Sequence, residues 1–158
     1  MQLNKFSGLL ALAPIVAGQL SVYPPGRPGI VYATLDLDTE TTGCLDAAGK
    51  WTMNEANCAA VFGNGQGGLS GPDGFYILDD AATITTTTVT WSTAWVATHI
   101  SQGRDAYDLI ANSGSSPTGG PVWYASQIPE GDDTVTLSGT SSAGAQQVSL
   151  TFNSTFEG

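Results

Sequence analysis

Apolar and polar residues alternate along the segment 31–38. The apolar positions are Val31, Ala33, Leu35 and Leu37, and the positions between them are Tyr32, Thr34, Asp36 and Asp38. A period of two places one set of side chains on each face of an extended chain. The pattern therefore predicts a half-buried β-strand over 31–38.

β-branched residues dominate a second segment, 83–91, which reads TITTTTVTW. Such residues lose rotamer freedom in a helix and fit a pleated surface, so they favour a strand. The predicted turn at 46–49 lies between a short strand at Cys44 and another around Trp51. We predict further strands, separated by segments rich in turn-forming residues, at 75–78, 95–100, 107–111, 122–128, 134–138 and 147–152.

One segment, 52–62, fits two local structures. Thr52 and Glu55 have the spacing of a capping box, which predicts a short helix, and a strand over 58–62 is the alternative. Short strands with a turn signal about every ten residues predict an all-β fold, either an antiparallel β-sandwich or a β-barrel. A parallel α/β sheet does not fit, because its crossover helices are missing from the pattern.

The amino terminus has the order of a secretory signal peptide. Lys5 precedes an apolar run over 6–16, and the small residues Ala17 and Gly18 follow it. The run is too short for a membrane span, which takes about 20 apolar residues. We expect a signal peptide at 1–18, a Pro/Gly-rich lead-in at 19–30 and a single β domain at 31–158. The mature protein is then secreted and extracellular, with no membrane partner.

Cys44 and Cys58 are the two cysteines of the chain. In an exported protein they are expected to form a disulfide with each other. The loop that they close has roughly 15 residues, for which the chain-entropy model gives about 3 kcal/mol of stabilisation. That is a large fraction of the total stability of a typical domain, about 5 to 15 kcal/mol.

Acidic residues outnumber basic ones by 14 to 4, and the formal net charge is −10. Nucleic-acid binding rests on clustered Lys and Arg side chains that neutralise phosphates. Four scattered basic residues do not supply such a cluster, so we expect no nucleic-acid partner. The acidic charge favours solubility, and we expect a monomer.

Few residues of the chain are candidates for a catalytic role. His99 is the single histidine. It lies in a predicted strand without a nucleophile-elbow motif, so we interpret it as an ordinary strand residue and not as part of a triad. The adjacent acidic pairs 79–80 and 132–133 lie beside turn-rich segments. We interpret them as solvated turn residues, and not as the paired carboxylates of a glycan hydrolase. No catalytic residue is therefore predicted.

Metal ligands are similarly scarce. A zinc site built on the two cysteines would lack ligands, because the chain has one histidine and no third cysteine. Asp36, Asp38 and Glu40 would share one strand face, which suits calcium, but Thr41 occupies the position where an EF-hand loop needs Gly. We therefore expect a hydrated strand face there, with no metal and no cofactor.

Aromatic residues carry the main binding hypothesis. Trp91, Trp95, Trp123 and Tyr124 would stack against sugar rings if they were exposed together. The alternative is that the tryptophans fill the core, and since Trp123 and Tyr124 are adjacent, at most one of them should face it. Asn153 begins the sequon NST and is a candidate glycosylation site in an exported chain.

A block of spaced glycine, cysteine and tryptophan residues resembles a known domain. The residues that carry the resemblance are Gly43, Cys44, Leu45, Gly49, Lys50, Trp51, Cys58, Ala59 and Phe62. Their spacing is similar to the start of the carboxy-terminal domain of fungal T-two-type ribonucleases, which also stands alone in small secreted fungal proteins. The resemblance covers residues 31–62. It implies a compact β domain with a Cys44–Cys58 clamp and a buried Trp51, in an accessory, non-catalytic role.

These features predict a small secreted β domain without catalytic activity that has a binding or structural role. Its partner is expected to be an extracellular carbohydrate or protein. A carbohydrate or cell-wall binding module that uses the exposed aromatics is one alternative. A secreted effector and a small glycan hydrolase are two others.

Overall fold

The computed structural model describes residues 28–35, 41–64, 67–89, 94–99, 106–112, 117–119 and 122–154. The strands in the first half of the chain are β1 (Pro28–Leu35), β2 (Thr41–Leu45), β3 (Trp51–Thr52), β4 (Val61–Gly63), β5 (Leu69–Gly71), β6 (Gly74–Leu78) and β7 (Ile84–Thr87). Those in the second half are β8 (Ala94–His99), β9 (Ala106–Asn112), β10 (Pro117–Gly119), β11 (Val122–Ala125), β12 (Thr134–Val135), β13 (Leu137–Ser138) and β14 (Gln146–Ser154). A single turn of 3-10 helix, η1 (Glu55–Asn57), is the one helical element of the described residues.

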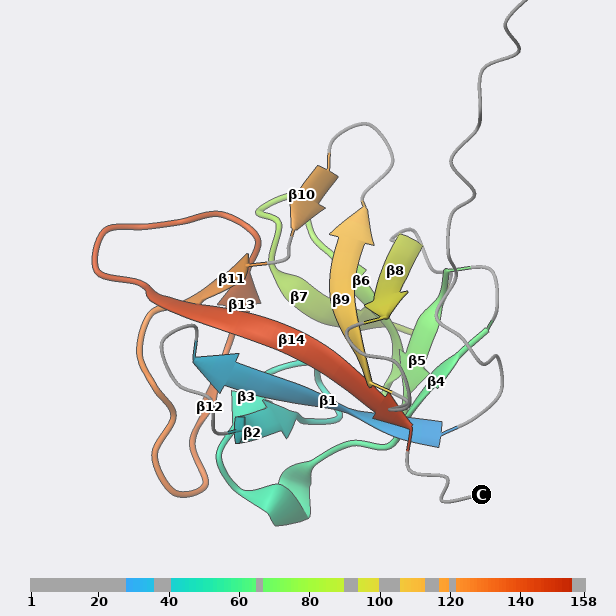
Figure 1. Cartoon of the computed structure of the whole chain (residues 1–158), viewed down its shortest axis with the longest axis horizontal. Coiled ribbons are helices and arrows are strands. Elements are labelled where there is room, and N and C mark those ends of the chain that lie inside the picture. The colour runs from blue at the N-terminus through green and yellow to red at the C-terminus, as the bar shows by residue number, and fades with distance from the viewer. Residues whose placement is uncertain are drawn as a thin grey trace, which may run out of the picture.

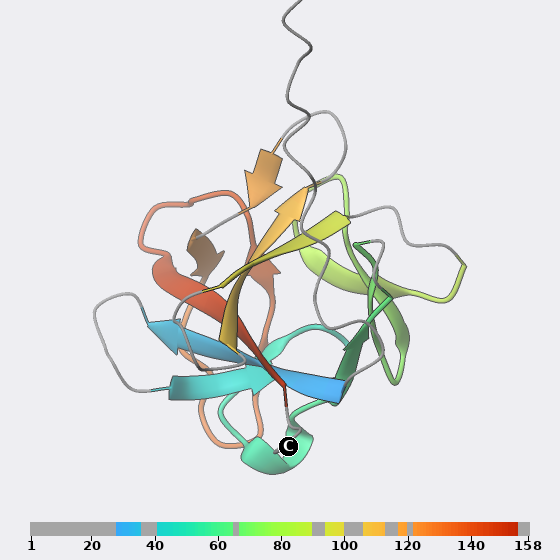
Figure 2. The same cartoon turned by 45° about the vertical axis from the view of Figure 1, so that its right-hand side comes forward.

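All the strands belong to one antiparallel sheet that curls on itself, as Figures 1 and 2 show. Its main path runs in the order β10-β9-β14-β1-β4-β5-β6-β7. Shorter strands branch from this path: β8 pairs with β9, β2 with β1 and β3, β3 with β12, and β11 with both β13 and β14. The all-β antiparallel fold predicted from the alternation is therefore confirmed. The described residues contain no helix with the length and apolar character needed to cross a membrane.

The longest strands match the predicted ones, with shifted ends. β1 begins at Pro28, inside the expected lead-in, and the predicted strand residues 36–38 lie outside the described part of the chain. The strand predicted at 134–138 is broken at Thr136, because β12 pairs with β3 whereas β13 pairs with β11. The strand predicted at 122–128 ends at Ala125, where a bend begins.

The ambiguous segment 52–62 contains both of the structures considered for it. The short helix is η1, but its N-cap is Asn54, whose side-chain oxygen accepts a hydrogen bond from the backbone N–H of Ala56 at 2.9 Å. The proposed Thr52 cap is therefore wrong, since Thr52 is buried and belongs to β3. The strand appears as β4, three residues long and later than expected.

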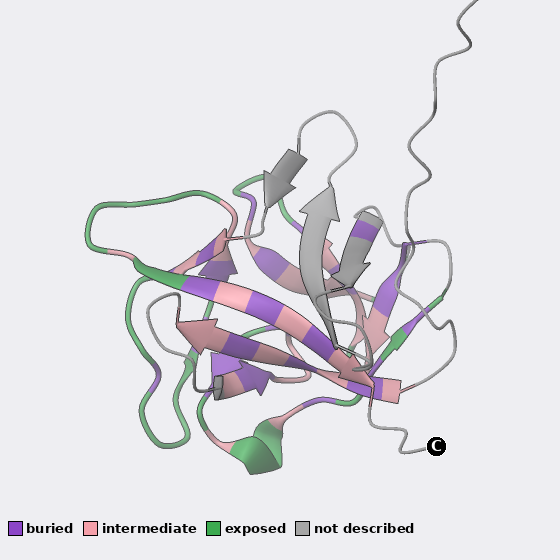
Figure 3. Ribbon diagram, viewed as in Figure 1, coloured by how far each residue is buried: buried purple, intermediate pink, exposed green. Residues whose placement is uncertain are grey.

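The core lies inside the curl, where β14 and β1 cross the middle of the molecule. Figure 3 shows buried and half-buried residues alternating along both strands. The buried residues of β14 are Val148, Leu150 and Phe152. Gly29 of β1 lies against the ring of Phe152, and a Cβ added there would come within 2.3 Å of a ring carbon. Glycine at this position therefore lets β1 pass close to the aromatic side chain.

Two hairpins, β2–β3 and β6–β7, close with the same turn. In each, an aspartate side-chain oxygen accepts hydrogen bonds from the backbone N–H groups two and four residues later. These aspartates are Asp46 and Asp79, and the fourth turn residue in each case has positive φ: +79° at Gly49 and +56° at Ala82. Ala82 is the one described residue other than glycine with a positive φ. The left-handed region disfavours residues with a Cβ, so Ala82 is held in a strained conformation.

Candidate functional site

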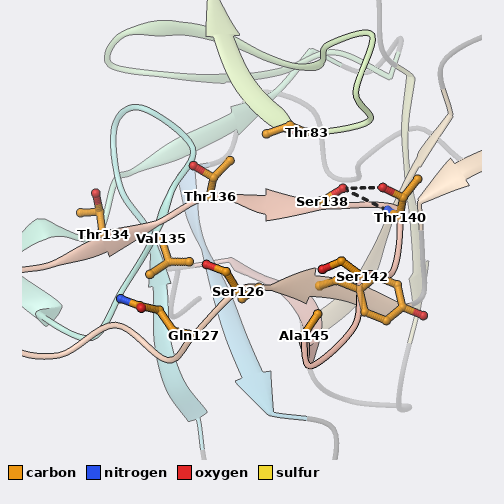
Figure 4. A pocket seen from close by; sticks show the side chains of 12 residues that line it. Thr83, Ser126, Gln127, Thr134, Val135, Thr136, Ser138, Thr140, Ser142 and Ala145 are labelled. Atoms are coloured by element: carbon orange, nitrogen blue, oxygen red, sulfur yellow. Dashed lines mark hydrogen bonds between the residues drawn. The ribbon is translucent and has the colours of Figure 1, made fainter.

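A cleft of about 510 Å³ lies beside the paired strands β11 and β13. Figure 4 shows side chains from several segments around this space. They come from Thr83 before β7, from residues 126–127 after β11, from β12 and β13, and from the connection between β13 and β14. The cleft therefore depends on segments that lie far apart in the sequence.

Hydroxyl groups dominate the cleft. The Ser and Thr side chains that line it are Thr83, Ser126, Thr134, Thr136, Ser138, Thr140 and Ser142. Gln127 adds an amide, and Tyr124 adds an aromatic ring with a phenol. Among the described residues that line the cleft, none is acidic, basic or a histidine. The cleft is thus a polar surface without formal charge on a strongly acidic protein.

The strand register aligns part of this lining in a row. Tyr124 of β11 pairs directly with Ser138 of β13, and Ser138 pairs in turn with Thr83. On the other side, Tyr124 pairs with Gln147 of β14. Side chains of directly paired residues project from the same face of a sheet. We call these four residues, Thr83, Ser138, Tyr124 and Gln147, the polar row.

Apolar residues on the opposite face hold the polar row in place. β11 alternates half-buried Val122 and Tyr124 with buried Trp123 and Ala125. Ala125 pairs with Leu137, which is also fully buried. A shift of the register by one residue would exchange the two faces, and burial of the apolar set prevents this. The sequence alternation along β11 therefore fixes on which face the Tyr124 side chain lies, although Ala125 of the other face is also among the residues that line the cleft.

Local hydrogen bonds also order the β13 side of the cleft. The hydroxyls of Ser138 and Thr140 lie 3.0 Å apart, and the backbone N–H of Thr140 donates to the Ser138 hydroxyl at 3.1 Å (Figure 4). The backbone N–H of Gly139 donates to the carbonyl oxygen of Ala82 at 2.7 Å. The strained turn residue thus connects the Thr83 segment to β13.

The tryptophans considered for ligand stacking belong mainly to the core. Trp95 and Trp123 are both fully buried, and their rings stack with centroids 5.7 Å apart. The indole N–H of Trp95 donates to the carbonyl oxygen of Tyr76 at 2.9 Å, so its polar group is satisfied inside the protein. Stacking on a ligand needs an exposed ring, and neither of these two rings is exposed in this structure. Trp91 lies outside the described residues, and Tyr124 alone of the four is found at the cleft.

Asn153 lies near the end of β14 and has neighbours on both sides. It pairs with Ile30 of β1 and with Ala106 of β9. Its side-chain oxygen is buried and has no hydrogen-bond partner among the described residues. The sequon therefore lies on a strand flanked by two others rather than at a free edge of the sheet, and its glycosylation stays a prediction.

The acidic residues of the predicted turns are exposed. Asp79 caps the β6–β7 turn, and Asp132 accepts a hydrogen bond from the Asn54 side chain at 2.6 Å. Asp36, Asp38 and Glu40 lie outside the described residues. Within the part of the chain that the structure describes, no three His, Cys, Asp or Glu side chains are grouped closely enough to hold a metal ion.

The disulfide between Cys44 and Cys58 is present, as predicted, with a Cα–Cα distance of 5.5 Å. It joins β2 to the residue that follows η1. Trp51 of β3 is fully buried and pairs with Leu45, the neighbour of Cys44. The clamp with a buried tryptophan is therefore a structural unit.

A buried tyrosine joins this clamp to the β6–β7 hairpin. The phenol of Tyr76 donates a hydrogen bond to the carbonyl oxygen of Asp46 at 2.9 Å. Burial raises the pKa of the Tyr76 phenol above its ordinary value of 10.0, and the negative charges of Asp46 and Asp73 raise the pKa further. The phenol therefore stays protonated and acts as a hydrogen-bond donor at neutral pH.

Most residues of the cleft were not among the sequence-based candidates. The segment 134–142 reads TVTLSGTSS, and its Ser and Thr residues are equally typical of turns and of exposed strand faces. The signal that remains in the sequence is the density of hydroxyl side chains just before the last strand. It does not reveal that Thr83 and Tyr124 lie beside them.

Comparisons with protein-family models, with curated proteins and with solved structures found no match to this chain.

Proposed function

We propose that this protein is a secreted, non-catalytic β domain whose cleft binds a neutral carbohydrate. The observation that carries the proposal is the composition of the cleft, a space of about 510 Å³ lined by seven Ser and Thr side chains, one amide, one tyrosine and three apolar residues, with no charged side chain among the described residues that line it. Binding sites for small ligands commonly have this size and use a few placed polar groups to fix orientation.

The chemistry of the lining suits a ligand rich in hydroxyl groups. Ser, Thr and Gln side chains donate and accept hydrogen bonds, as the hydroxyls of a sugar do. The half-buried ring of Tyr124 offers an apolar surface with a polar end, which suits the mixed faces of a pyranose ring. A net charge of −10 disfavours anionic ligands, so the expected carbohydrate is uncharged.

Binding rather than hydrolysis is proposed because the cleft lining supplies no general acid or base. Glycoside hydrolysis commonly uses two carboxyl groups on either side of the bond that breaks. In the part of the chain that the structure describes, no Asp, Glu or His lines the cleft. A non-catalytic role also agrees with what the resemblance to the accessory ribonuclease domain implies. The disulfide supports an oxidising, extracellular location, since such bonds are rare in the cytosol.

The test is retention of the exported protein on insoluble glucan, chitin and cellulose, followed by titration with soluble fragments of the polysaccharide that retains it. Tyr124→Ala removes the stacking ring, and we expect about tenfold weaker binding, equivalent to about 1.4 kcal/mol. Tyr124→Phe keeps the aromatic ring, so its binding affinity should fall less than that of Tyr124→Ala. Phe62→Ala is the matched control, because Phe62 is an exposed aromatic residue outside the cleft. Lack of retention on all three materials, or equal losses in Tyr124→Ala and Phe62→Ala, would refute the proposal.

A further inference from the structure

The polar row extends beyond the lining of the cleft. Thr83, Ser138 and Tyr124 line the cleft, whereas Gln147 lies one strand further along the same row and is exposed. Because Gln147 pairs directly with Tyr124, its side chain projects from the same face of the sheet as the tyrosine ring. The surface available to a ligand therefore continues from the cleft onto β14.

The length of this surface follows from the spacing of the strands. Neighbouring strands lie about 4.8 Å apart, so a row that crosses three such spacings is roughly 14 Å long. Tyr124 is an interior member of the row, with hydroxyls on one side and an amide on the other. A single sugar ring stacked on Tyr124 would leave at least one end of the row without a ligand group.

Thr83 and Gln147, at the two ends of the polar row, differ in how firmly the surrounding structure fixes them. Thr83 follows the strained residue Ala82, whose carbonyl oxygen is bound by Gly139, so this end is fixed to β13. Figure 4 shows Thr83 close to the segment that carries Thr136 and Ser138, and Thr83 pairs with Ser138. Gln147 is an exposed amide with two donor hydrogens and an acceptor oxygen, a set that can bind two adjacent hydroxyls of one sugar.

We propose that Gln147 forms a second subsite, so that the ligand is a neutral oligosaccharide chain lying across β13, β11 and β14. The inference rests on the proposed function and names the ligand more narrowly than that function does. One sugar stacks on Tyr124, and the next sugar along the chain hydrogen-bonds to Gln147. Affinity therefore rises with chain length until the chain covers the row.

The chain offers a matched control for this subsite. Gln146 precedes Gln147 on β14, is also exposed, and pairs with Ala125, which is buried although it is one of the residues that line the cleft. Adjacent residues of a strand project to opposite faces, so the Gln146 side chain lies away from the polar row. Gln146→Ala and Gln147→Ala thus remove the same group from opposite faces of one strand.

The experiment titrates the full-length exported protein with neutral β-1,4-glucose, β-1,3-glucose and β-1,4-N-acetylglucosamine oligomers, from the monosaccharide to the hexasaccharide. We expect affinity to increase with length in the series that binds. Gln147→Ala should lower the affinity for the longer oligomers about fivefold and leave the affinity for the monosaccharide unchanged. Gln146→Ala should change neither affinity. Circular dichroism confirms that both variants are folded.

Three results would overturn the inference, and the third is distinguishable from the first two. Equal affinity for short and long oligomers, or equal effects of the two glutamine substitutions, would refute the subsite and leave the proposed function standing. Failure of the unmodified protein to bind any oligomer would refute the proposed function and the subsite with it.

Discussion

The two equivalent hairpin turns predict unequal effects on stability for exchanging glycine and alanine. At Gly49 the backbone has φ +79°, and a Cβ would lie 3.0 Å from the Cγ2 of Ile84 and 3.4 Å from a ring carbon of Tyr76. Both neighbours belong to the buried core, so they cannot move away freely. Gly49→Ala therefore adds both conformational strain and a crowded contact.

The magnitude follows from three contributions. A residue with a Cβ in the left-handed region costs about 1 to 2 kcal/mol. Replacing glycine recovers about 0.5 to 1 kcal/mol of conformational entropy in the unfolded chain. Crowding in a packed core costs about 1 kcal/mol or more. We expect Gly49→Ala to lower the free energy of unfolding by about 2 kcal/mol, which lowers Tm by roughly 6 °C.

The reverse change in the second turn is the control. Ala82→Gly relieves the strain at φ +56°, but it loses the burial of one methyl group and adds flexibility to the unfolded chain. These effects nearly cancel, so its free energy of unfolding should stay within about 0.5 kcal/mol of the parent. Urea unfolding followed by fluorescence of the buried tryptophans measures both variants. A neutral Gly49→Ala, or an Ala82→Gly that costs as much as Gly49→Ala, would show that the reasoning about these turns is wrong.

Two further predictions concern the clamp and Tyr76. Reduction of the Cys44–Cys58 disulfide should lower the free energy of unfolding by about 3 kcal/mol, measured by urea unfolding with and without a reductant; an unchanged midpoint would contradict this. The raised pKa of Tyr76 means that its contribution to stability is complete below the ordinary pKa of 10.0 and is lost as pH rises above it. The urea midpoint of the parent should therefore fall in alkaline solution more steeply than that of Tyr76→Phe, and equal slopes would argue against a buried phenol.

Short-range patterns were sufficient to predict the fold class. A period of two along β1, β11 and β14 is a property of neighbouring residues, and it corresponds to the buried and half-buried faces that the structure has. The disulfide could also be predicted from the sequence, because the chain has only two cysteines. The prediction that at most one of the adjacent residues Trp123 and Tyr124 faces the core also agrees with the structure, since Trp123 is buried and Tyr124 is half-buried.

The residues that form the cleft could not be predicted from such local patterns. Its polar row joins Thr83, Tyr124, Ser138 and Gln147, which are neighbours only because of strand register. No local pattern specifies that β13 pairs with β11 while β12, two residues earlier, pairs with β3. Burial of Trp95 against Trp123 is likewise a contact between distant strands, and composition leaves open whether such rings are buried or exposed.

The sequence by itself determined the positions of the longest strands, the buried faces of β1, β11 and β14 and the cysteine pair, because these follow from the order of adjacent residues and from the supply of thiols. Only the tertiary structure decided which strands are neighbours, which aromatic rings enter the core and where hydroxyl groups gather into a cleft. The physical reason is that side-chain alternation sets a strand's face locally, whereas pairing between distant strands is selected by the packing of the whole core.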